Sequence, residues 1–90
     1  MKFKLGQCVA SSNAVGLMDR QRINPLHLLM RHVNGDWGDL DAEDKELNDA
    51  AVASGEERIF SAYVLPSGDK LWVITEHDRS LTTMLLPDDY

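Results

Sequence analysis

Residues 58–86, RIFSAYVLPSGDKLWVITEHDRSLTTMLL, decide the fold of this 90-residue chain. Two runs rich in β-branched and aromatic residues, 58–65 and 70–76, flank the sequence Pro66-Ser67-Gly68. Proline at the first position and glycine at the third are typical of a three-residue hairpin loop, in which a type I turn is closed by a left-handed glycine. The segment therefore predicts a β-hairpin.

The hairpin loop fixes a register, in which three pairs of residues face each other: Phe60 with Ile74, Ala62 with Trp72 and Tyr63 with Leu71. A second turn at residues 77–80 leads into a third apolar run, 81–86, which Pro87 ends. The C-terminal third therefore predicts a three-stranded antiparallel meander.

Upstream of the hairpin, residues 2–10 alternate between apolar and polar side chains and predict an N-terminal strand that can join the sheet. Helices are expected at 14–21, 25–33 and 42–54. Asn24 with Pro25 starts the second helix, and Asp41 and Gly55 bound the third. The chain length suits one domain. We expect a single α+β domain over 1–90, with the meander and three short helices on one face of the sheet.

Hydrophobic spacing predicts which helix faces are buried. In the second helix, an apolar stripe is formed by Leu26, Leu29, Met30 and Val33. In the third, a narrow face of Leu47, Ala50 and Ala51 is expected to pack inward, and no basic residue stands near its C-terminal end.

Both faces of the predicted sheet are apolar. Phe60, Trp72, Ile74 and Leu85 share one face, and Tyr63, Leu71, Val73 and Met84 share the other. Three short helices can cover only one of them. The N-terminal segment, a second copy of the chain or another protein must therefore cover part of the second face, which predicts a homodimer or a protein-binding surface.

Charge is distributed unevenly along the chain. Residues 36–57 contain nine acidic residues against Lys45, a net charge of −8, whereas residues 1–35 contain five basic residues against Asp19, a net charge of +4. The whole chain has a net charge of −6, and no basic stripe alternates with aromatic residues. We therefore expect a partner protein with a basic surface and no direct binding to nucleic acid.

The sequence also bears on cellular location and cofactors. No apolar run is long enough to cross a bilayer, the N-terminus has no signal peptide, and the single Cys8 excludes an internal disulfide. These features predict a cytoplasmic protein without membrane contact. His27 and His32 are five residues apart, which turns them away from each other on a helix, and no metal or cofactor motif is present. We expect no cofactor.

Two loops carry the residues that an enzyme would need. Glu76, His77, Asp78 and Arg79 lie in the second turn and, together with the loop of Asp36, suggest a small hydrolase or nuclease as an alternative function. Trp37 stands between acidic residues in that other loop, where it either fills the core or anchors an interface.

Most of the chain from residue 5 onward resembles a family of short bacterial proteins carried on plasmids and integrated elements, whose function is not established. The resemblance rests on residues 31–40, RHVNGDWGDL, on 74–90, ITEHDRSLTTMLLPDDY, and on Ser61-Ala62-Tyr63 and Trp72. Members are labelled plasmid-related or restriction-modification subunits. Ninety residues cannot hold a methyltransferase domain, and no cofactor-binding glycine motif is present. The resemblance therefore implies only a mobile-element setting.

These observations together predict a non-enzymatic protein-binding module of a mobile element. By analogy with other small acidic proteins in that setting, it would inhibit a host defence nuclease complex of the restriction or CRISPR type. The residues expected to bind the partner are Asp36, Trp37, Asp39, Asp41, Glu43, Glu46, Asp49, Asp78 and Arg79. A structural homodimeric subunit is the remaining alternative.

Overall fold

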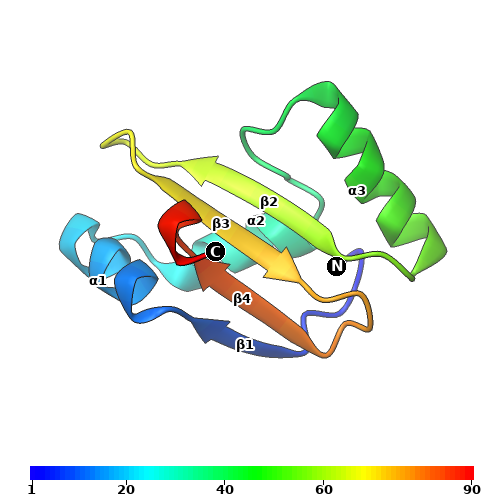
Figure 1. Cartoon of the computed structure of the whole chain (residues 1–90), viewed down its shortest axis with the longest axis horizontal. Coiled ribbons are helices and arrows are strands. Elements are labelled where there is room, and N and C mark those ends of the chain that lie inside the picture. The colour runs from blue at the N-terminus through cyan, green and yellow to red at the C-terminus, as the bar shows by residue number, and fades with distance from the viewer.

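The computed structural model describes residues 1–90 and has an α+β fold with a four-stranded mixed sheet and three helices (Figure 1). Its elements, in chain order, are β1 (Gln7–Ala10), α1 (Ser12–Gln21), α2 (Pro25–Val33), α3 (Ala42–Ser54), β2 (Ile59–Val64), β3 (Lys70–Thr75), β4 (Leu81–Leu85) and a 3-10 turn, η1 (Pro87–Asp89). The sheet order is β1-β4-β3-β2. The β2, β3 and β4 strands are antiparallel, and β1 adds to β4 in parallel.

The β2–β3 hairpin has the predicted register, with Phe60 opposite Ile74, Ala62 opposite Trp72 and Tyr63 opposite Leu71. In its turn, the Gly68 N–H donates to the Leu65 carbonyl at 2.8 Å, and Gly68 has a φ of 92°. The local rules for turn residues were therefore sufficient for this part of the fold.

The N-terminal strand is shorter than predicted, because the extended segment is interrupted at Gly6. Gly6 has a φ of 66°, and a Cβ added there would lie 2.4 Å from the carbonyl carbon of Ser80. This close approach to the β3–β4 loop turns the chain away from the sheet. Only Gln7–Ala10 forms β1, while the Lys2 N–H donates to the Val33 carbonyl at the end of α2.

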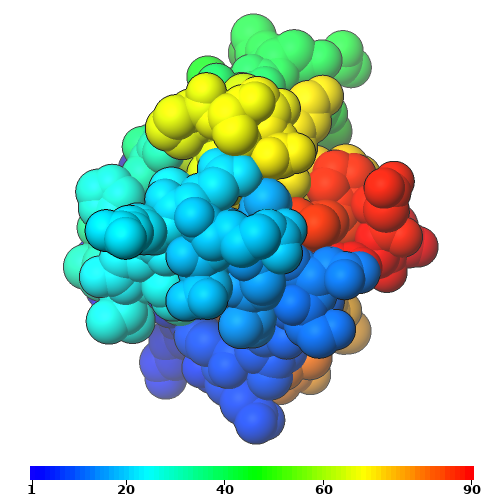
Figure 2. Space-filling model, turned by 90° about the vertical axis from the view of Figure 1, so that its left-hand side faces the viewer, coloured from blue at the N-terminus to red at the C-terminus, as the bar shows by residue number.

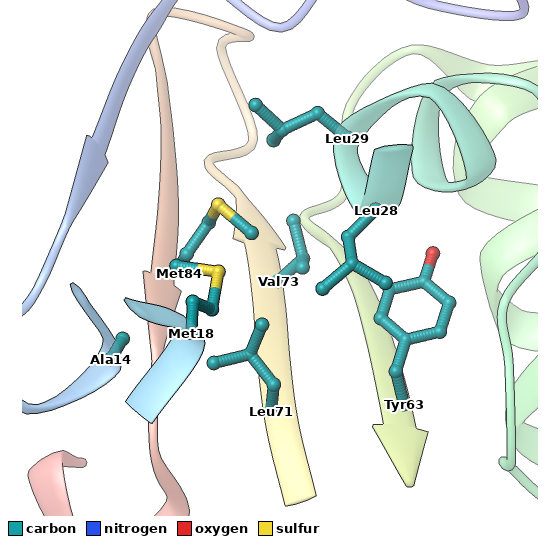
Figure 3. Packing of buried hydrophobic residues seen from close by; sticks show 8 residues of the cluster. All are labelled: Ala14, Met18, Leu28, Leu29, Tyr63, Leu71, Val73 and Met84. Carbon is teal, nitrogen blue, oxygen red and sulfur yellow. The ribbon is translucent and has the colours of Figure 1, made fainter. Parts of the chain in front are cut away.

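Helices α1 and α2 cover one face of the sheet. The end of α1 is tied to the hairpin tip, since the Gln21 amide donates to Asp69 at 2.9 Å, and both lie at the same end of the molecule (Figure 2). Side chains from both helices and three strands meet in the main core (Figure 3), which consists of Ala14, Met18, Leu28, Leu29, Tyr63, Leu71, Val73 and Met84.

The predicted stripe of α2 was half wrong. Leu29 and Val33 are buried, but Leu26 and Met30 are 66% and 54% exposed. The helix is rotated so that Leu28 and His32 face the sheet instead. The spacing of apolar side chains does not predict this orientation, because His32, one of the residues that face the sheet, is polar.

His32 is fully buried and takes part in a chain of polar groups. Its Nδ1 lies 2.6 Å from the Ser61 hydroxyl, and its Nε2 lies 2.9 Å from the Thr75 hydroxyl. Thr75 contacts the Thr82 hydroxyl at 2.7 Å, and that hydroxyl donates to the Leu5 carbonyl at 2.7 Å. Burial lowers the pKa of His32 to about 4. The ring is therefore neutral in the folded protein at neutral pH.

Helix α3 does not lie on the same face as α1 and α2, as the sequence predicted, but runs along the edge of β2 (Figure 1). The Asn48 amide donates to the Phe60 carbonyl at 2.6 Å, and the Phe60 N–H donates to the Asn48 Oδ1 at 3.0 Å. Of the predicted apolar face, only Ala51 is buried, in a small cluster with Trp37 and Ile59. The polar side chain of Asn48, and not an apolar stripe, therefore holds α3 against β2.

The edge of β2 is closed along its length. The Asp39 N–H donates to the Ala62 carbonyl at 2.7 Å, and the Ala62 N–H donates to the Trp37 carbonyl at 3.2 Å. The Asp39 carboxylate accepts from the Val64 N–H at 2.8 Å. With Asn48 on Phe60, the outward N–H and C=O groups of Phe60 and Ala62 and the N–H of Val64 are bonded, so this edge offers no continuous free ladder to another chain.

None of the three helices combines the length and the apolar character that spanning a bilayer requires.

The low pKa of His32 predicts a pH-dependent stability. An unfolded histidine, with a pKa near 6.5, binds a proton that the folded ring at about 4 does not, so the folded state loses stability as the pH falls through this window. The free energy of unfolding should drop by roughly 3 kcal/mol between pH 6.5 and 4. Urea titrations at several pH values measure it. The variant His32→Gln should be less stable at neutral pH and show a flatter profile.

The ring resonances of His32 in the folded wild type provide a second measurement, which does not require the variant to fold. They should stay unchanged by NMR as the pH falls from 7 to about 5. Protonation near pH 6.5 would contradict the buried neutral ring.

The clamp of Asn48 on β2 predicts a second stability effect. Asn48→Ala removes two hydrogen bonds and leaves the backbone of Phe60 without partners, so the free energy of unfolding should fall by about 2–3 kcal/mol. The opened edge should also make the variant associate as its concentration rises. Glu46→Ala on the exposed face of α3 is the control and should change stability by less than about 0.5 kcal/mol. Equal effects of the two changes would show that Asn48 does not hold the helix.

Candidate functional site

The second face of the sheet carries a groove of about 400 Å³ between α3 and the C-terminus. Its floor is formed by the apolar side chains of β2 and β3, and α3 and Tyr90 form its walls. The lining residues are Leu40, Asp44, Leu47, Asn48, Arg58, Phe60, Trp72, Ile74 and Tyr90. Its volume and its mostly apolar lining are those of a binding site.

Aromatic rings arranged edge to face form the floor and one wall of the groove. The centroids of Phe60 and Trp72 are 5.0 Å apart, and those of Trp72 and Tyr90 are 5.9 Å apart. The Arg58 guanidinium donates to the Tyr90 hydroxyl at 2.6 Å and lies 5.7 Å from the centre of that ring. These contacts hold Tyr90 beside the groove although its side chain is 67% exposed.

The opposite wall belongs to α3 and is acidic. Leu47, 64% exposed, lines the groove together with Asp44. Glu43 and Glu46 lie on the same helix and are also exposed. None of these carboxylates takes part in an ion pair, because the single ion pair of the chain joins Arg31 to Asp36. The groove is therefore bordered by an acidic helix, but Asp44 is the one carboxylate among its lining residues, which also include Arg58.

Four of the acidic residues predicted to bind a partner serve the fold. Asp36 accepts from Arg31 Nε at 2.6 Å, and this hydrogen bond lowers the pKa of the Asp36 carboxyl. Asp41 caps α3 by accepting the Asp44 N–H at 2.8 Å, while Asp39 closes the edge of β2. Asp49 accepts from the Trp37 indole at 3.0 Å. Their side chains are held in the structure, and replacing them would disturb folding as well as any interface.

Trp37 is not an exposed anchor. Its side chain is only 4% exposed and stacks on Phe3 at 6.1 Å between ring centroids, with His32 at 6.0 Å. The indole fills the space between α2, α3 and the N-terminal segment. Of the two readings that the sequence left open for Trp37, the structural one is correct.

Asp78 and Arg79 also have roles within the fold. The Asp78 carboxylate accepts from the Ser80 hydroxyl at 2.6 Å and from its N–H at 3.0 Å. The Arg79 guanidinium donates to the backbone carbonyls of Glu57 at 2.6 Å and Ala51 at 2.9 Å, among others. It thereby supplies the positive charge that the C-terminal end of α3 lacks in its own sequence.

The residues of the hydrolase or nuclease alternative lie in the turn between β3 and β4 and not in the groove. Glu76, His77, Asp78 and Arg79 are all absent from the groove lining. The structure brings no three His, Cys, Asp or Glu side chains together to hold a metal ion. Ser61 and His32 form a contact like that of a nucleophile and its base, but both are fully buried and no substrate reaches them.

Sequence reasoning predicted an acidic binding surface that included Glu43 and Glu46, but it missed the groove and Asp44, the carboxylate that lines it. Arg58 and Tyr90 were not considered, and Leu47 was assigned to the core. Two signals were present: an apolar residue surrounded by acids on a helix, and an aromatic residue at the end of a chain whose sheet has two apolar faces.

Comparisons with protein-family models, curated proteins and solved structures found no match to this chain.

The position of Arg79 predicts a structural effect of a conservative change. Arg79→Lys keeps the charge but loses the planar fork that reaches the carbonyls of Glu57 and Ala51 together, so the free energy of unfolding should fall by about 1–2 kcal/mol. Thermal or urea unfolding measures this. Arg20→Lys on the exposed surface of α1 is the matched control, and an equally small effect of both changes would contradict the anchoring role.

Proposed function

We propose that this protein is a non-enzymatic protein-binding module, in which the groove between α3 and Tyr90 receives a basic amphipathic segment of a partner. The observation that carries the proposal is an apolar groove bordered by the acidic helix α3, whose Asp44 lines the groove and forms no ion pair. Apolar side chains of the segment would rest on Phe60 and Trp72, and its basic side chains would meet Asp44 and its neighbour in sequence, Glu43.

Charge favours such a partner over a second copy of the chain. A two-fold dimer across this face is isologous, so each copy would contribute the same surface and the acidic helices would approach each other across the interface. Like charges in such an arrangement disfavour association. The acidic wall instead favours encounter with a basic surface and increases the rate of association at low salt.

A nuclease complex is a partner of this chemistry, because a surface that binds phosphate groups is rich in lysine and arginine. The resemblance of the sequence to proteins of mobile elements also supports a nuclease complex as the partner. We therefore propose that the module inhibits a host defence nuclease by occupying a basic surface of that complex. No side chain of the groove is required to react.

The test is affinity capture with the tagged chain in bacteria that contain active restriction and CRISPR nucleases. Wild-type protein should retain a nuclease subunit with a basic surface at low salt and release it at high salt. Asp44→Lys should reduce the retained amount by about tenfold, because Asp44 lines the groove and the charge change opposes the encounter. Leu47→Ser should reduce it as well, and it should leave stability almost unchanged because Leu47 is largely exposed.

Asp19→Lys, on the helix α1 that covers the opposite face of the sheet, is the control with the same change in charge and should retain the partner normally. Wild-type retention by both Asp44→Lys and Leu47→Ser would contradict the groove as the site. Capture of a partner that belongs to no nuclease complex would contradict the inhibitor role.

A further inference from the structure

The two edges of the sheet differ in whether their outward backbone groups have hydrogen-bond partners. At β2, the outward groups of Phe60 and Ala62 and the N–H of Val64 are bonded by Asn48, Asp39 and the backbone of residues 37–39. At the other edge, β1 pairs only with β4, and all four of its residues are exposed. A sheet with one edge closed by specific contacts and the other left open presents a single place where a further strand can add.

The hydrogen bonds of β1 identify the groups that point outward. The Gln7 N–H donates to the Ser80 carbonyl at 3.0 Å, and the Ser11 N–H donates to the Met84 carbonyl at 2.9 Å. In a parallel ladder, alternate residues of a strand bond to the same neighbour. Cys8 and Ala10, which lie between these positions, therefore direct their N–H and C=O groups away from β4.

An apolar notch of about 240 Å³ lies beside this edge. It is lined by residues of β1, α1 and the segment that leads into α2: Ala10, Val15, Met18, Asp19, Ile23 and Pro25. Val15 is 52% exposed at the mouth of the notch. Figure 2 shows α1 at this end of the molecule with the N-terminal segment beside it, and no other element lies over them in this view.

The notch lies beside the side chains that β1 places on the helix-covered face of the sheet. Cys8 pairs with Thr82 and Ala10 with Met84, so the side chains of Cys8 and Ala10 share the helix-covered face with these buried residues. A strand added outside β1 would alternate in the same way. One of its side chains on the helix face would then stand next to Ala10, at the mouth of the notch.

We propose that the edge of β1 is a second recognition site, which binds an extended segment of another protein as a fifth strand. The segment bonds to the backbone of Cys8 and Ala10 and inserts one large apolar side chain, of the size of leucine or phenylalanine, between α1 and Ile23. Backbone bonds supply affinity in this mode of recognition, and the pocket for an alternate side chain supplies specificity. Asp19 disfavours an acidic residue beside the inserted side chain.

A second copy of the chain is a poorer occupant. In an antiparallel pair of β1 strands related by a two-fold axis, the side chains brought to the helix face of the neighbour are Cys8 and Ala10. Both are too small to fill the notch, which would remain empty. The chemistry of the site therefore points to a segment that carries a larger apolar side chain than β1 itself has on that face.

The test is selection of random dodecapeptides displayed on phage against the whole chain. Selected peptides should alternate in polarity around one leucine, isoleucine or phenylalanine. A synthetic peptide with the selected sequence should shift the backbone amide resonances of Cys8 and Ala10 in NMR titrations. Ala10→Pro should weaken its binding by about tenfold or more, because proline removes an outward N–H without removing a ladder bond.

Val15→Asp, at the mouth of the notch, should also weaken binding, and it is a surface change that keeps the test valid if Ala10→Pro does not fold. Val9→Thr, on the opposite face of β1, is the control and should bind normally. Three outcomes would overturn the proposal: no selected peptide, binding unaffected by Ala10→Pro and Val15→Asp, or resonance shifts confined to the groove of Trp72. Selection of peptides that repeat the β1 sequence would overturn the choice of occupant.

Discussion

One buried side chain, the imidazole of His32, connects most of the structure. Thr82 donates its only hydroxyl proton to the Leu5 carbonyl, so Thr75 must donate to Thr82 and accept from Nε2 of His32. Nδ1 then accepts from the Ser61 hydroxyl. The directions are mutually consistent, and no buried side-chain polar atom in the chain lacks a partner. A single neutral tautomer thereby links α2 to β2, β3, β4 and the N-terminal segment.

This constraint determines where the remaining elements can lie. Because α2 turns His32 toward the sheet, α2 and α1 cover that face of the sheet, and α3 is left to run along β2. Its amide clamp closes the edge, and Trp37 fills the space behind it. The opposite face keeps its aromatic residues half-covered, which leaves the groove between α3 and Tyr90. The open groove is thus a consequence of how the first face is filled.

The acidic segment contains two kinds of carboxylate that the sequence alone does not separate. Asp39, Asp41 and Asp49 each accept a hydrogen bond that holds the loop or the helix, although all three residues are exposed. Glu43 and Glu46 make no side-chain contact of this kind. Carboxylates in an acidic segment can therefore help to determine the fold and still form a charged surface, because a hydrogen bond orients a carboxylate without neutralising it.

The sequence by itself determined what depends on neighbours within a few residues: the hairpin register, the caps at Asn24 and Asp41, and the left-handed Gly55 that ends α3. These features follow from local dihedral preferences and short-range hydrogen bonds. The tertiary structure alone decided the rotation of α2, the position of α3, the parallel pairing of β1 and the groove. Each depends on contacts across dozens of residues, such as His32 with Ser61, whose polar character gives no periodic apolar signal in the chain.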